Sequence, residues 1–339
     1  MANEEKTSFF RSHCWKIIGL AAGFILIFTI AVMLANYRFP AFFESQKPEK
    51  NIPGVVFTSS IITIGGQMFD NWLPNDFLWP TILLDNPQNF QIGQLLMLNY
   101  TVLRLRENLS RLRSSDTMDP NCSEAYTLLS NDPYKWILPS SESRFKKAIA
   151  ELETYRANLE SGRARFSPRA DNLTELLVNY VSALGALNSE LAKAPKELRL
   201  KSVYPAAPSP LPAPADPTNA TAPDSPAPLL SDPAPEAKAQ TQTPYRRVDD
   251  NFYRAQGAAY VLRQMLAAIR IDFIEILELK KATELVDDII LTLDQSQFEP
   301  WVVLNGDIGS LTANHSMELH SILENSRQKI NNLIEMLSQ

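Results

Sequence analysis

The chain has 339 residues, a net charge of −6 at pH 7 and hydrophobic residues at 45% of its positions. No stretch concentrates Lys and Arg into the basic field that nucleic-acid binding requires, so the composition argues against a nucleic-acid partner. The two cysteines, Cys14 and Cys122, are too few for a small disulfide-stapled extracellular scaffold.

A run without formal charge extends from Ile17 to Tyr37. About 20 apolar residues at 1.5 Å rise each cross the hydrocarbon core of a bilayer. The run is longer than the roughly 7–15 apolar residues of a cleaved signal peptide, and Met33 stands where a cleavage site would need a small residue. We therefore expect an uncleaved transmembrane anchor over 17–37, preceded by a tail over 1–16.

Basic residues stand in equal number on the two sides of this run. They are Lys6, Arg11 and Lys16 before it, and Arg38, Lys47 and Lys50 after it. Lys and Arg resist translocation across the membrane. The tail is short and basic, and its only transport signal is the anchor itself, so we expect the tail to stay in the cytoplasm. The bulk of the chain then lies on the opposite side of the membrane.

The segment from 38 to 90 is predicted to be a small β-rich and irregular region close to the membrane. Its first part, 54–66, is rich in β-branched and aromatic residues before Gly65 and Gly66, which favours a strand or hairpin. Its second part, from Asn71 to Phe90, is aromatic and interrupted by prolines, so we expect an ordered loop there.

From 91 to 204 the dominant pattern is helical, because apolar residues recur at alternating spacings of three and four. Ser167 and Pro168 read as the N-cap and first residue of the last helix in this part, which forms a hairpin with the helix before it. Three stripes carry the pattern: Leu95, Leu98, Val102, Leu105, Leu109 and Leu112; Phe145, Ile149, Leu152, Leu159 and Phe166; and Leu173, Leu177, Tyr180, Leu184, Leu187 and Leu191.

The segment 205–244 holds 12 of the 24 prolines and is otherwise rich in Ala, Asp and Thr. Proline lacks the amide hydrogen and fixes φ, so we predict a disordered, solvated linker or inserted loop. It is either a spacer or a tolerated insertion without a role of its own.

The last part, 245–339, again has helical stripes. The first stripe runs over more than three heptads, as in coiled coils, and consists of Phe252, Ala255, Ala259, Leu262, Leu266, Ile269, Phe273 and Ile276. The second stripe reaches the end of the chain and consists of Leu319, Leu323, Ile330, Leu333 and Leu337. A helix must bury its apolar face against something. The predicted fold is therefore mainly α, with an N-terminal transmembrane helix followed by an antiparallel helical bundle.

Residues that carry chemistry do not form a recognisable motif. The three histidines, His13, His315 and His320, have no metal-ligand spacing, so no metal or cofactor is expected. Cys122 is expected to be an inert thiol. Four arginines, at positions 104, 106, 111 and 113, flank the first helical stripe and are interpreted as its solvated border.

The most site-like cluster combines polar and aromatic side chains in the loop before the first stripe. It consists of Trp79, Asp85, Asn86 and Asn89. Its alternative interpretation is a loop with Asx-type turns over a small aromatic core.

Several segments resemble an uncharacterised family of bacterial single-pass inner-membrane proteins, a domain of unknown function. They are Asn75–Phe90 (NDFLWPTILLDNPQNF), Leu105–Asp116 (LRENLSRLRSSD), Asn131–Ser140 (NDPYKWILPS) and Phe298–Gly306 (FEPWVVLNG) together with the last helix. The resemblance implies a bacterial envelope protein, and it supplies no activity, cofactor or catalytic residue. With the orientation expected above, the bulk of such a protein lies in the periplasm. Since resembling segments lie on both sides of 205–244, that segment is expected to be an insertion within one domain.

Two classes of function are consistent with these observations. The first is a membrane-anchored interaction or scaffold protein without catalysis, which binds envelope proteins or a second copy of itself. Its first candidate contact face is the stripe with Phe252, Leu262, Leu266, Ile269 and Phe273. The alternative is an envelope hydrolase or other enzyme with an unrecognised site near residues 72–90.

Overall fold

The computed structural model describes residues 2–37, 39–45, 52–76, 81, 84–113, 116–193, 247–300, 303–305 and 313–339. The Pro-rich segment 205–244 lies outside these residues. The described chain is mainly helical, as predicted, and contains no strand beyond an isolated bridge between Asn305 and Asn314. The helices are α1 (Ala2–Asn36), α2 (Val55–Phe69), α3 (Asp85–Arg104), the π-helical turn η2 (Leu105–Leu109), α4 (Pro120–Leu129), α5 (Ser141–Glu160), α6 (Ala170–Ala192), α7 (Val248–Asp272), α8 (Ile274–Leu279), α9 (Thr283–Asp294) and α10 (His315–Ser338).

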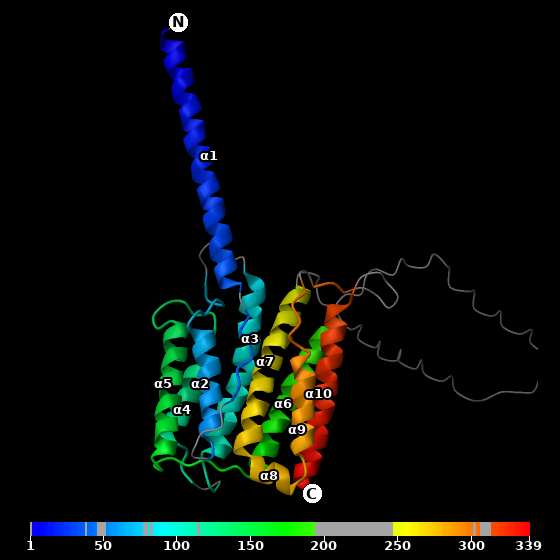
Figure 1. Ribbon diagram of the computed structural model, residues 1–339. Coiled ribbons are helices and arrows are strands. Elements are labelled where there is room, and N and C mark those ends of the chain that lie inside the picture. Colours follow the sequence, from blue (N-terminus) through cyan, green and yellow to red (C-terminus); the bar gives the residue numbers. More distant parts are fainter. Residues whose placement is uncertain are drawn as a thin grey trace, which may run out of the picture.

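Helix α1 projects from one end of the bundle (Figure 1). Its segment Trp15–Asn36, of 22 residues with a mean hydropathy of 2.8, is long and apolar enough to cross a membrane. Only 6% of that segment's apolar window is buried inside the protein, so the helix is not part of the bundle core. The segment overlaps the predicted anchor, and the helix continues without a break into the tail.

The expected strand or hairpin over 54–66 is wrong, because α2 occupies Val55–Phe69. Its buried residues Phe57, Ile61, Ile64 and Met68 lie on one helical stripe. The stripe packs against α5 and α7, and this burial outweighs the strand preference of the β-branched residues.

Asp272, the last residue of α7, caps the start of α2. Its Oδ2 accepts the backbone N–H of Phe57 at 2.6 Å, across 215 residues of sequence. The residue before the helix, Gly54, has a φ of +87°, which few residues other than Gly adopt. The helix is thus started by a tertiary contact rather than by a neighbouring side chain.

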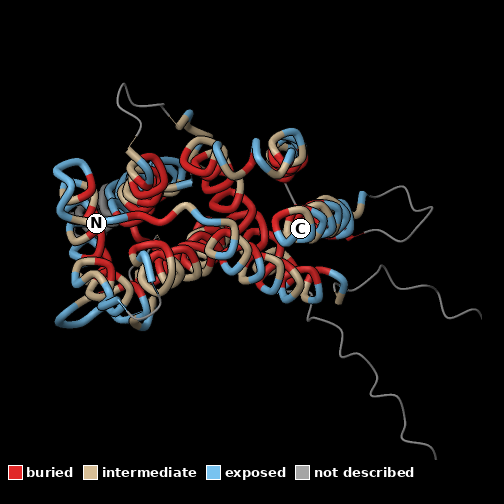
Figure 2. The backbone as a smooth tube through the Cα atoms, turned by 90° about the horizontal axis from the view of Figure 1, so that it is seen from below, coloured by how far each residue is buried: buried red, intermediate tan, exposed pale blue. Residues whose placement is uncertain are grey.

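The helical stripes of the sequence are buried in one continuous core, which lies between the helices (Figure 2). Three details differ from the expectation. The first stripe ends at Leu109 because η2 closes the helix, and Leu112 is exposed. Helix α6 begins at Ala170 with Arg169 as its N-cap residue, so Ser167 does not cap it. The long stripe of the last part breaks at Phe273, where α7 gives way to α8.

Helices α3 and α7 form the centre of the bundle and run in the same direction (Figure 1). Asn89 bonds Asp250 near their starts, and one turn later Gly93 faces Arg254. A Cβ on Gly93 would lie 1.9 Å from the carbonyl oxygen of Arg254, and a Cβ on Gly257 would lie equally close to that of Phe90. The two glycines therefore permit a backbone contact between these helices.

The remaining helices flank the central pair. Helices α2, α4 and α5 lie on one side, while α6, α9 and α10 lie on the other (Figure 1). Helices α4 and α9 carry no stripe that the sequence analysis identified. Helices α4 and α5 pack antiparallel, and so do α9 and α10, as predicted for an antiparallel bundle. The expected hairpin of the two helices on either side of Ser167 is wrong, because α5 packs against α2 and α4 whereas α6 lies across the central pair against α10.

Candidate functional site

A segment that follows α1, residues 39–45, packs against the central helix α7. Phe39 stacks on Tyr253 with the ring centroids 5.4 Å apart, and Phe42 stacks on Tyr260 at the same separation. The hydroxyl of Tyr260 also donates to the carbonyl oxygen of Ala41 at 3.1 Å. We call this segment the strap. Because the strap packs along α7, the chain that leaves α1 continues as a packed contact on the bundle.

A crevice of about 230 Å³ lies where the end of α1 meets the bundle. Its wall comes from the end of α1, the strap, the end of α2 and the first half of α3. Asn71 Nδ2 donates to Asn36 Oδ1 at 2.9 Å across this junction. The Gln94 side chain lines the crevice, and its Nε2 is buried without a hydrogen-bond partner among the described residues.

The site-like cluster predicted in the loop is only partly within the described residues, since Trp79 lies outside them. Its other members, Asp85, Asn86 and Asn89, are not in a loop, because α3 already begins at Asp85. Asp85 is exposed in the first turn of α3, and Asn86 Nδ2 lies 3.4 Å from the hydroxyl of Tyr37. Asn89 Nδ2 donates to Asp250 Oδ1 of α7 at 2.7 Å. These residues lie beside the crevice, but the wall of the crevice is formed by their neighbours Pro87 and Phe90.

Carboxylates from two helix starts gather around this cluster. Partial burial raises the pKa of Asp249 and of Asp250, and the charge of Asp85 raises both further. The sequence could not show this grouping because Asp85 and the α7 pair are far apart in the chain. Among the described residues, no group of His, Cys, Asp and Glu has the geometry of a metal site.

The predicted contact stripe lies inside the protein. Its members Phe252, Leu262, Leu266, Ile269 and Phe273 are each at most 1% exposed. Their partners are other helices of the same chain, so this stripe is core and not a surface that a second protein could reach.

A polar groove lies at the bundle end away from α1. It consists of two adjoining hollows of about 360 and 510 Å³, which share Asn108, Asp171 and Asn172. The first is also lined by Glu107, Arg111, Leu112, Arg113 and Arg169, and the second by Thr174, Glu175, Leu337 and Ser338. We call this surface the far-end groove. It is formed by η2, the start of α6 and the end of α10.

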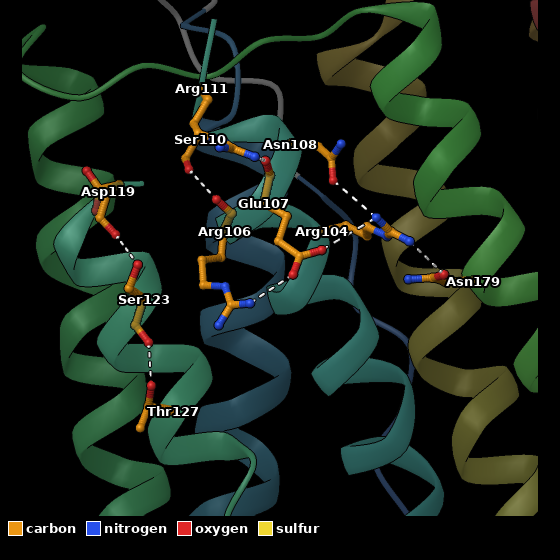
Figure 3. A network of polar contacts seen from close by, with 10 residues as sticks. All are labelled: Arg104, Arg106, Glu107, Asn108, Ser110, Arg111, Asp119, Ser123, Thr127 and Asn179. Atoms are coloured by element: carbon orange, nitrogen blue, oxygen red, sulfur yellow. Dashed lines mark hydrogen bonds and ion pairs between the residues drawn. The ribbon is translucent and has the colours of Figure 1, made fainter. Parts of the chain in front are cut away.

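The π-helical turn fixes the charged side chains beside the groove (Figure 3). Arg104 donates to Asn108 and to Asn179 of α6, and it pairs with Glu107 and Glu175 at 3.5 Å each. These contacts hold α3, η2 and α6 in one register.

Arg106 is held on the other side of Glu107. Its Nη2 lies 2.8 Å from Glu107 Oε1, and its guanidinium carbon lies 4.2 Å from the ring centroid of Tyr126. The side chains of Arg104 and Arg106 are about one-fifth exposed, so they are not the solvated helix border that the sequence suggested. A π turn has no signature in the sequence spacing, and such turns are frequent at functional sites.

Cys122 lies near this network in α4 and is buried. Burial raises the pKa of its thiol well above the ordinary value, and the nearby Asp119 carboxylate adds to the rise. A thiol held in its neutral form is a poor nucleophile, as expected for an inert thiol.

Comparison with known proteins gives one match. A family model described as "Uncharacterized protein conserved in bacteria (DUF2333)" matches residues 11–339. No curated protein and no solved structure was found to match the chain.

Proposed function

The chain belongs to the bacterial family DUF2333, and from that premise we propose that it is a membrane-anchored interaction protein of the cell envelope. In this proposal the Trp15–Asn36 segment of α1 spans the inner membrane, the tail is cytoplasmic and the bundle stands in the periplasm. The bundle acts by noncovalent contact with another envelope protein at the far-end groove, and not by catalysis.

One observation carries the proposal. The far-end groove is an ordered polar surface, and it lies at the end of the bundle opposite to the end from which α1 emerges. The strap supports the proposal, because it packs on α7 through stacked rings and accepts hydrogen bonds from the Tyr260 hydroxyl and the Gln264 side-chain amide at its backbone carbonyl oxygens. A surface that is fixed relative to the bilayer can meet a partner at a set distance and orientation, with less conformational entropy to lose on binding.

The charges of the groove indicate the chemistry of the partner. Arg113 and Arg169 stand exposed beside Asp171 and Glu175. Arg169 pairs with Asp171 at 2.8 Å and Glu175 with Arg104 at 3.5 Å, so the groove presents exposed ion pairs of both signs, which a partner can exchange for its own. Arg guanidinium groups recognise carboxylates by paired hydrogen bonds. A protein segment with acidic and basic side chains fits this surface, and mixed charge supports specificity and association rate more than affinity alone.

Site-specific photocrosslinking in cells tests the proposal. A photoreactive amino acid at Leu112 or at Thr174, which line the two hollows, should capture the same partner protein, identified by mass spectrometry. The matched control is Glu153, on the exposed side of α5, which should capture little or none of it. An adduct with the mass of two copies would identify self-association.

A charge-reversed variant completes the test. Arg113→Glu with Arg169→Glu should abolish capture at Thr174 while the helical circular-dichroism signal is retained and the thermal midpoint changes little, because both side chains are exposed and the exposed Arg169–Asp171 pair contributes only ~0–1 kcal/mol. Equal capture at Glu153, or capture that survives the charge reversal, would refute the groove as the contact site.

A further inference from the structure

The connection between α4 and α5 concentrates exposed apolar side chains in a short stretch of sequence. Four of its five consecutive residues from 134 to 138 are large apolar side chains that face solvent: Tyr134 is 55% exposed, Trp136 53%, Ile137 52% and Leu138 91%. Elsewhere in the described bundle, exposed large apolar side chains such as Val178, Leu279 and Leu291 lie singly on different helices. Single exposed residues are ordinary, whereas a contiguous patch marks an interaction site. We call residues 134–138 the apolar loop.

The backbone of this loop is tied inward while its side chains point outward. Trp72 Nε1 donates to the carbonyl oxygen of Pro133 at 3.0 Å, and Asn75 Nδ2 donates to that of Lys135 at 3.3 Å. Ser141, at the start of α5, binds the same Lys135 carbonyl oxygen through its N–H at 2.8 Å and its hydroxyl at 2.9 Å. The exposure is therefore built into an ordered loop.

The loop lies at the bundle end from which α1 emerges (Figure 1). Asn71 bonds Asn36, the last residue of the hydrophobic span, and the adjacent Trp72 bonds the loop at Pro133. The loop is thus attached to residues that meet the end of the span, which is the level of the lipid headgroups if α1 crosses the bilayer.

We propose that the apolar loop inserts into the headgroup region of the bilayer that holds α1, as a second membrane contact beside the anchor. Trp and Tyr rings favour this interface, Ile137 and Leu138 supply apolar area, and Lys135 can reach lipid phosphate. The proposal rests on the anchoring part of the proposed function. Its consequence is that the bundle is held at two points, so its tilt toward the membrane is fixed.

Fluorescence quenching in vesicles tests the contact. The full-length protein, with Cys14→Ser and Cys122→Ala, carries one NBD label at Leu138→Cys and is reconstituted into phosphatidylcholine–phosphatidylglycerol vesicles. A lipid nitroxide near the headgroup should quench most of the emission at position 138. The same label at Leu112→Cys, exposed at the far end, should stay unquenched. A label at position 138 that is not quenched would overturn the proposal. If the emission of that label is blue-shifted but still not quenched by lipid nitroxides, the loop is covered by a protein partner or a second copy, and the proposal is overturned as well.

A third label and a charge variant separate the outcomes. A label at Ile27→Cys, inside the span, should be quenched by a nitroxide deep in the acyl chains. If this label is not quenched, the anchoring itself fails; if it is quenched and position 138 is not, only the loop contact fails. Ile137→Glu should restore aqueous emission at position 138, whereas Leu279→Glu on α8 should not. Persistent quenching in the Ile137→Glu variant would contradict the insertion.

Discussion

Replacing Gly93 with Ala tests the backbone contact between the two central helices. The added methyl would lie 1.9 Å from the carbonyl oxygen of Arg254, whereas real Cβ contacts essentially never fall below 3.0 Å. The obstructing atom is backbone, so it cannot turn away as a side chain could. Helices α3 and α7 must therefore separate by roughly 1 Å at this point.

The size of the effect follows from two opposed contributions. Overpacking of a well-packed core costs ~1–3 kcal/mol, while Ala in place of Gly inside a helix gains ~0.5–1 kcal/mol. The expected net loss is ~0–2.5 kcal/mol relative to wild type. Relative to a Gly→Ala control without an obstruction, which keeps the helix gain, the loss is ~1–3 kcal/mol, and each kcal/mol lowers the thermal midpoint by ~2–4 °C.

The assay is thermal unfolding of the purified full-length protein, followed by circular dichroism. Gly66→Ala in α2 and Gly185→Ala in α6 are matched controls, because the methyl group added at either position would meet no heavy atom of another element within 4 Å. These controls should leave the midpoint unchanged or raise it. Gly257→Ala should resemble Gly93→Ala, and the double variant should lose less than the sum of the two, since helices that have separated once can accept the second methyl.

A Gly93→Ala protein as stable as the Gly66→Ala and Gly185→Ala controls would refute the close helix contact. So would full additivity of Gly93→Ala and Gly257→Ala, because the two methyls would then act at independent places.

Three further predictions concern other parts of the chain. Burial raises the pKa of Asp272 to about 6, above the ~3.9 of an unfolded Asp, so the native state binds the extra proton and wild type should gain up to about 3 kcal/mol of unfolding free energy relative to Asp272→Asn as pH falls from 7 to 4; a pH-independent difference in urea unfolding between the two proteins would contradict this. Cys122 should resist maleimide in the folded protein and react in denaturant, and labelling at equal rates in both would refute its burial. A C-terminal alkaline phosphatase fusion should be active and a fluorescent-protein fusion dark, whereas the opposite pattern would reverse the proposed orientation.

The sequence predicted the helical core well because burial of one face leaves a periodic trace. The stripes that end at Leu191 and Leu337 are buried along their length. The failure at α2 has a physical cause: its helical spacing was present, but β-branched residues favoured a strand, and the deciding cap comes from Asp272 on a distant helix. Tertiary contacts of this kind are not readable from local composition.

The candidate site was less predictable than the fold. The stripe that contains Leu262 was recognised as a strong apolar face, yet periodicity alone does not say whether its partner is the same chain or another. The groove depends on the π turn at Leu105–Leu109 and on the meeting of α3 with α6, which bring Arg104 to Asn179. Neither leaves a pattern along the sequence, although Arg104 and its neighbouring arginines stood out as a charged group.

The proposed roles of the strap, the apolar loop and the far-end groove all require that α1 remains in the mature chain and spans the bilayer. Intact mass and N-terminal analysis of the mature protein, purified from carbonate-washed membranes, tests this requirement most directly. We predict that the protein stays with the membranes and keeps residues 15–36. A mature chain that begins after Asn36 and is recovered in the soluble fraction would contradict the account, since α1 would then be a removed signal sequence.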